Sequence, residues 1–180
     1  MDWPRPIFVA PTIMHPHHPD ALGGALVAAV LNAVTATPWV VANKAYYYPF
    51  KLYDWATVYQ LMFFVGSASS GNVDIGIYDG QGNRIVSAGS TAMSATANTI
   101  QVINVTDTVL PPGDYFLALA RDTTSGNQYA TGIADELGLS QFPIYEEASA
   151  FPLPATATPV KCTDNTVNIF SCGAQLVPTF

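Results

Sequence analysis

The stretch VDIGIYDGQGNRIVSA, residues 73–88, decides the fold class. Val73, Ile75 and Ile77 alternate with small or polar residues, which is the two-residue period of a strand with one buried face. Residues 79–83, DGQGN, are rich in residues that tolerate the positive φ angles of a tight loop, and residues 84–88 follow as the return strand. The pattern predicts an antiparallel β-hairpin over residues 73–88.

Apolar runs continue on both sides of this hairpin, and turn signals separate them at intervals of about 8–12 residues. They predict strands at 45–53, 58–65, 100–109, 115–120, 128–133, 167–170 and 174–177. The same alternation predicts that Tyr115, Leu117 and Leu119 lie on a strand facing the apolar side of the hairpin. We therefore expect an all-β protein, an antiparallel β-sandwich.

The N-terminal part differs in composition. Five prolines within residues 1–20 predict an extended arm, because proline cannot continue a regular helix. Residues 21–34 follow a capping Asp20 and predict one short helix, too short and too interrupted for a membrane span. We accordingly divide the chain into an arm and docking segment, 1–38, and a sandwich domain with an irregular C-terminal region, 39–180. The acidic second residue and the early prolines do not fit a secretion signal.

The charge balance limits the partners. The chain has 6 basic and 13 acidic residues, and charged residues make up only 11% of it. A nucleic-acid partner is not expected, because neutralising phosphates requires clustered basic side chains. Residues 21–43 and 85–106 contain no charged side chain. Such long uncharged stretches indicate either deep core or surface covered by other subunits. We favour covered surface and expect a homo-oligomer, with a trimer among the options.

Motifs for chemistry are missing from the sequence. It contains no phosphate-binding loop, no nucleophile elbow and no zinc-protease helix motif. All three histidines, His15, His17 and His18, lie in the arm, where they are the candidate metal ligands. We expect a protein that is not an enzyme and holds no cofactor.

Four stretches resemble one family. They are ANKAYYYPFKL (42–52), GNVDIGIYDGQGNRIVSAGS (71–90), LPPGDYFLALARD (110–122) and PLPATATPV (152–160). Their order and spacing are similar to those of β-sandwich modules in virion proteins of tailed bacteriophages. The resemblance implies a jelly-roll-like sandwich on the particle, in a tail, fibre or head-decoration position. It also implies localisation to the virion and other virion proteins as partners.

Candidate contact residues follow from this role. In and after the arm, the large apolar side chains that we expect at an interface are Trp3, Ile7, Phe8, Val9, Trp39, Tyr46, Tyr47 and Tyr48. The aromatic cluster has three interpretations: core, subunit interface or a platform for host glycans. For the platform the candidates are Tyr53, Trp55 and Tyr59.

The two cysteines, Cys162 and Cys172, are separated by nine residues and do not have the spacing of a zinc site. They fit two reduced thiols as well as a disulfide that closes a C-terminal loop.

Overall fold

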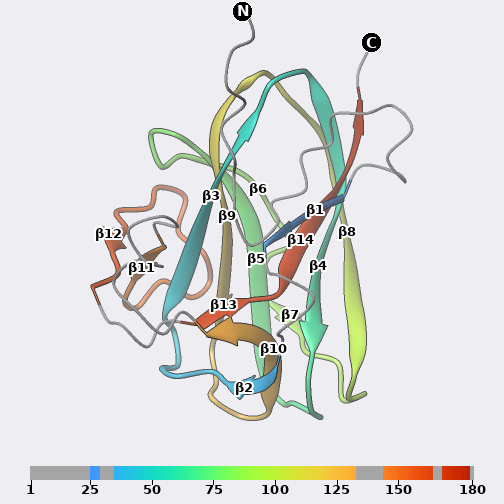
Figure 1. Cartoon of the computed structure of the whole chain (residues 1–180), viewed down its shortest axis with the longest axis vertical. Helices are drawn as coiled ribbons and strands as arrows, with labels where there is room; N and C mark the ends of the chain where they lie inside the picture. Colours follow the sequence, from blue (N-terminus) through green and yellow to red (C-terminus); the bar gives the residue numbers. More distant parts are fainter. Residues whose placement is uncertain (1–24, 29–34, 133–143, 164–167, 179–180) are drawn as a thin grey trace, which may run out of the picture.

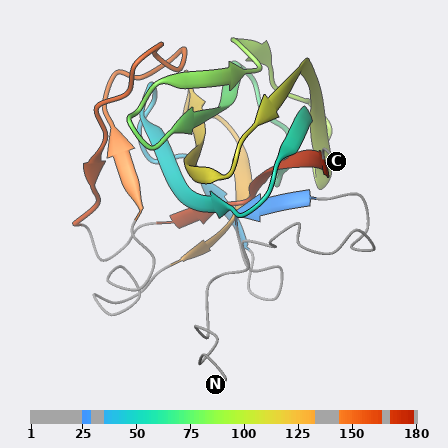
Figure 2. The same cartoon turned by 90° about the horizontal axis from the view of Figure 1, so that it is seen from above.

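A computed structural model describes residues 25–28, 35–132, 144–163 and 168–178 of the chain. Two antiparallel sheets pack against each other over the described residues, and none of these residues is helical. Figure 2, seen from above, shows the strands curving around a common interior. The predicted all-β sandwich is confirmed.

The first sheet, here called sheet A, has the strand order β1-β14-β4-β10-β13, with β8 paired to β4 and β2 paired to β10. β8 forms its margin beside β4, at the right of Figure 1. Within the described residues its strands are β1 (Ala25–Ala28), β2 (Thr35–Pro38), β4 (Ala56–Val65), β8 (Thr99–Leu110), β10 (Asn127–Gly132), β13 (Asn168–Phe170) and β14 (Cys172–Pro178).

The second sheet, sheet B, has the order β12-β11-β3-β9-β5-β6, and β7 also pairs with β5. The predicted hairpin forms its β5–β6 part, with Gly82 at a φ of 85° in the turn. Within the described residues its strands are β3 (Ala45–Leu52), β5 (Asn72–Asp79), β6 (Arg84–Ser87), β7 (Thr91–Ala92), β9 (Gly113–Arg121), β11 (Tyr145–Glu147) and β12 (Val160–Lys161).

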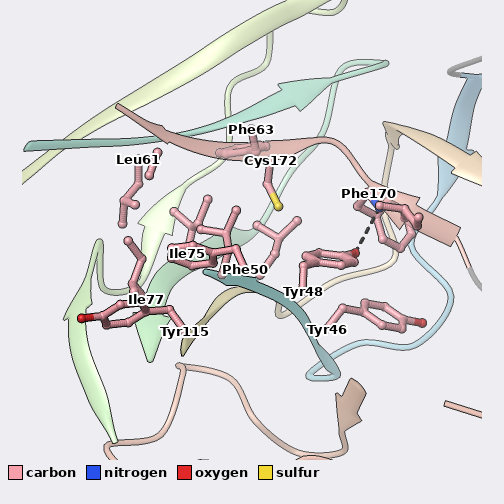
Figure 3. Close-up of a cluster of buried hydrophobic side chains, with 14 of the residues drawn as sticks. Tyr46, Tyr48, Phe50, Leu61, Phe63, Ile75, Ile77, Tyr115, Phe170 and Cys172 are labelled. Atoms are coloured by element: carbon pink, nitrogen blue, oxygen red, sulfur yellow. Dashed lines mark hydrogen bonds between the residues drawn. The ribbon is translucent and has the colours of Figure 1, made fainter. Parts of the chain in front are cut away.

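The main core fills the space between the sheets (Figure 3). From sheet B, the inward residues of the hairpin and of β9 enter it as the two-residue period predicts. Leu61 and Phe63 of β4 face them from sheet A. Each large side chain buried in this way contributes about 1.5–3 kcal/mol.

The position of β9 differs from the prediction. We expected Tyr115, Leu117 and Leu119 on a strand facing the hairpin, but β9 pairs directly with β5 in the same sheet. The three side chains therefore lie beside those of the hairpin rather than across from them. Alternation along a strand shows which side chains share a face, but it carries no information on which sheet the strand joins.

A second apolar cluster lies on the other side of sheet B. Tyr47 and Tyr78 leave the sheet on its outer face, where Ala150, Leu153 and Ala157 pack on them. These three residues belong to the segment 148–159, which connects β11 to β12 and lies over the outer face of sheet B as a third layer (orange in Figures 1 and 2). The Tyr78 hydroxyl donates to the Pro154 carbonyl at 2.6 Å and fixes this layer.

The helix predicted within 21–34 is wrong for the part described. Residues 25–28 form β1, which pairs antiparallel with β14. Two consecutive glycines precede this segment and weaken a helix, and pairing with the apolar β14 supplies backbone hydrogen bonds instead. β2 likewise joins sheet A, so this sheet contains residues on both sides of the predicted boundary between residues 38 and 39. The proline-rich residues 1–20 lie outside the described part.

Several short strands were not predicted. Besides β1 and β2, they are β7, and β11 and β12 in the C-terminal region. No helix in the described part is long and apolar enough to cross a membrane.

The buried Tyr48 hydroxyl provides one test of the core. It accepts a hydrogen bond from the Phe170 N–H at 3.0 Å (dashed in Figure 3) and so links β3 to β13. Tyr48→Phe leaves that buried N–H without this acceptor, and we expect it to lower the free energy of unfolding by about 1–3 kcal/mol. Tyr129→Phe is the control, because its hydroxyl bonds Asn98 at an exposed site. Urea denaturation measures both variants, and equal losses would contradict this assignment.

The contributions of two β5 aspartates to folding stability should change with pH in opposite directions. Burial raises the pKa of Asp74 above its ordinary 3.8, although Ser87 Oγ and the Leu153 N–H donate to it. Hydrogen bonds from Asn83 lower the pKa of Asp79, which is only partly buried. Asp74 therefore contributes stability below pH 3.8 that is lost as the pH rises through its raised pKa. Asp79 contributes stability above pH 3.8 that is lost as the pH falls through its lowered pKa.

We test this with Asp74→Asn and Asp79→Asn, each compared with the wild type by chemical denaturation across about pH 2–7. As the pH rises above 3.8, the wild type should lose stability relative to Asp74→Asn. As the pH falls below 3.8, it should lose stability relative to Asp79→Asn. Parallel difference curves for the two variants would refute the assignment.

Candidate interaction surface

The aromatic residues that we expected at an interface are mostly core residues. Trp39, Tyr46 and Tyr48 lie in the main core, where the Trp39 ring is 4.4 Å from the ring of Phe170 between centroids. Tyr47 lies in the second cluster, and its hydroxyl donates to Glu147 Oε2 at 2.7 Å. All four side chains are buried in their own chain, which corrects their assignment as contacts. The sequence could not show this, because Phe170 and Glu147, which contact these side chains, lie 100 or more positions further along the chain.

The other expected contact residues, Trp3, Ile7, Phe8 and Val9, lie outside the described residues. So do the candidate metal ligands His15, His17 and His18. The described part contains no group of three or more histidine, cysteine or acidic side chains placed to hold a metal ion.

Both cysteines are buried, and the structure holds them as thiols rather than as a disulfide. Cys172 points from β14 into the main core (Figure 3). Complete burial raises the pKa of its thiol, which keeps it protonated and unreactive. Of the two interpretations of this pair, the structure supports the reduced thiols.

The buried side chain of Arg121 was not among the predicted site residues. The Arg121 guanidinium lies 5.7 Å from the centroid of the Trp39 ring and donates to the Ser125 carbonyl, tying the β9–β10 turn to the core. Burial lowers its pKa to about 10, so it stays charged at neutral pH. Its Nε and Nη1, and the Trp39 indole nitrogen, have no hydrogen-bond partner among the described residues. With no exposed surface, Arg121 is a structural residue at this end of the sandwich.

An aromatic turn joins β3 to β4. Tyr53 and Trp55 keep 53% and 49% of their surface exposed, whereas Tyr59, further along β4, is half-buried. The carboxylate of Asp54 between them accepts a hydrogen bond from the Trp55 backbone N–H at 2.8 Å and shapes the turn. Lys51 lies beside the Tyr53 ring, 6.0 Å from its centroid, and pairs with Asp114 at 3.2 Å. This turn therefore exposes two aromatic rings with charged groups beside them.

The outer face of sheet A carries almost no charge. Its strands β1, β4, β8 and β14 contain one charged residue, Asp107. Across the middle of this face runs a row of amides, Asn104, Gln60 and Gln175, in which Gln60 Nε2 donates to Asn104 Oδ1 at 2.7 Å. Ile100 and Val102 lie on one side of the row and stay half-exposed.

The margin of this face is a long strand. β8 has 12 residues and pairs only with β4 among the described residues. The other outer strands of both sheets have four residues or fewer: β1, β2, β6, β7, β12 and β13. Short edge strands offer few backbone groups for pairing with other chains. β8 is long and lacks this protection. The sequence predicted this strand without indicating that it lies at an edge.

No family model, curated protein or solved structure matches the chain. The candidate surface is therefore interpreted from its own geometry.

Proposed function

We propose that the chain is a structural, non-enzymatic protein of a bacteriophage virion, in which the sandwich is displayed and the N-terminal arm docks to neighbouring subunits. One observation carries the proposal. The four stretches that resemble phage virion modules are distant in sequence, yet they form one packed unit. Three of them contain β3, β9 and β5, which are neighbours in sheet B. The fourth, 152–160, packs on the outside of these strands.

The surface supports an assembly role. An acidic chain with a formal net charge of −7 repels copies of itself except where its surface is uncharged. The outer face of sheet A is such a region and exposes valine and isoleucine side chains. Many copies on one particle would add avidity to a weak single contact.

Deleting residues 1–20 tests the docking part of this proposal. The deletion removes none of the described strands, so we expect the melting temperature of the sandwich to be unchanged. We expect the truncated chain to be missing from particles when it replaces the full chain during infection. Mass spectrometry of purified particles measures incorporation, and the full-length chain is the control. Normal incorporation of the truncated chain would refute docking by the arm, and absence of the full chain would refute the virion role.

A second function, binding of a host-surface glycan, is favoured by the exposed rings of Tyr53 and Trp55. Aromatic faces stack on the apolar faces of sugar rings, and the nearby Lys51, Asp54 and Asp114 supply hydrogen-bonding groups. This function is compatible with a virion protein that contacts the host.

A glycan array tests this second function. We expect Trp55→Ala to weaken binding about 5- to 10-fold, since ring stacking contributes roughly 1 kcal/mol beyond burial. Val40→Ala is the control and should bind like the wild type, because Val40 is an exposed apolar residue in the β2–β3 connection. Failure of the wild type to bind any glycan would remove this candidate.

A further inference from the structure

We infer that the edge of β8 pairs with the same edge of a second copy of this chain, as two antiparallel strands related by a twofold axis. This deepens the proposed function and rests on the chain being an assembly subunit, because it names one contact of that assembly.

The edge lacks the devices that normally prevent strand addition. β8 contains no proline, lysine or arginine, and its residues before position 107 are uncharged. By contrast, the part of β3 that extends beyond its partner β11 carries Pro49 and Lys51. Proline and lysine are two of the common means of blocking an exposed edge. Among the described strands, the other edges are therefore short or blocked, and the edge of β8 away from β4 has no paired strand.

The length of β8 indicates that the strand added at its edge is the β8 of a second copy. An added strand must match the edge that it extends, and β8 is the long open edge among the described residues. A twofold pairing of β8 with itself uses the same edge on both copies, so the contact closes and does not propagate into fibres. Strand addition of this kind supplies main-chain hydrogen bonds along the new junction.

The register follows from an irregularity in β8. Val58 faces Thr108 and Gln60 faces Asn104, so residues 105–107 all lie opposite Tyr59. This bulge ends the straight part of the strand, which therefore runs from Thr99 to Asn104. Centring the twofold axis on Val102 pairs residues 100–104 of the two copies and keeps the bulge out of the junction.

In this register Val102 lies opposite Val102 of the second copy, and Ile100 lies opposite Asn104. Antiparallel partners share one face of a sheet, so Ile100 and Val102 of both copies gather on the outer face. These two side chains are 50% and 48% exposed in one chain, and pairing covers part of that surface.

Charge is compatible with the pairing. Asp107 is the single charged residue of β8 and lies five positions from the axis. The two Asp107 side chains are then about 30 Å apart along the paired strands, well beyond the screening length of about 8 Å at physiological ionic strength. Two copies with net charge −7 thus meet through an uncharged segment.

The test compares the full chain with two lysine variants by light scattering and sedimentation, at about 1–200 µM protein. We expect the wild type to show twice the monomer mass of 19.2 kDa at the upper concentrations. Val102→Lys should remain at the monomer mass, because two ammonium groups would face each other at the axis. Val109→Lys is the matched control: it is a valine of the same strand that is 50% exposed but lies beyond the bulge, and it should dimerise like the wild type.

A cysteine variant checks the register independently. Val102→Cys should form an intermolecular disulfide under mild oxidation, because directly opposed Cβ atoms lie about 4.5–5.5 Å apart. Val109→Cys should not, and the native cysteines are buried and should not react.

A wild type that stays monomeric, a Val102→Lys variant that dimerises, or a Val102→Cys dimer that forms no crosslink would each overturn the pairing. A monomeric chain that is nevertheless found in particles refutes the β8 contact alone. A dimer that is absent from particles leaves the pairing in place and refutes the virion role on which the assembly interpretation rests.

Discussion

Sheet B is apolar on both faces, and much of the structure depends on keeping both faces away from water. Along β3, Tyr46 and Tyr48 point between the sheets, while Tyr47 points to the other side. Sheet A covers the first face, and the segment 148–159 covers the second. The buried carboxyl group of Asp74 holds that segment by accepting the Leu153 N–H at 3.0 Å. A sandwich with a third layer is the result.

This arrangement leaves the two sheets with different relations to solvent. Sheet B has a cover on its outer face, and its outer strands are short. The outer face of sheet A instead presents amides and half-exposed aliphatic side chains, and it ends in the long strand β8. The surfaces that we propose for interaction are therefore the outer face and edge of sheet A and the aromatic turn at residues 53–55. Both proposed functions use surface, not a cleft, and differ in whether the partner is a protein or a sugar.

The virion role and the β8 contact have different foundations. The virion role depends on a sequence resemblance whose residues pack together in sheet B. The β8 contact depends on the lengths, composition and register of strands in sheet A, and these features hold whatever the origin of the chain. The resembling residues are mainly core residues, so the resemblance bears first on the fold, and the virion role stays a proposal.

The sequence by itself determined the strand alternation, the hairpin at 73–88 and the inward faces of β5 and β9, because a two-residue period needs only local information. It did not determine β1, where two glycines and an apolar run suit several conformations and pairing with β14 decides. Nor could it place Trp39 and Tyr46–48 in the core, because the residues that bury them lie about 100 positions away along the chain. Whether β8 is central or at an edge, and whether β9 lies beside β5 or across from it, is likewise decided only by tertiary structure. Strand order depends on long-range pairing that leaves no local pattern.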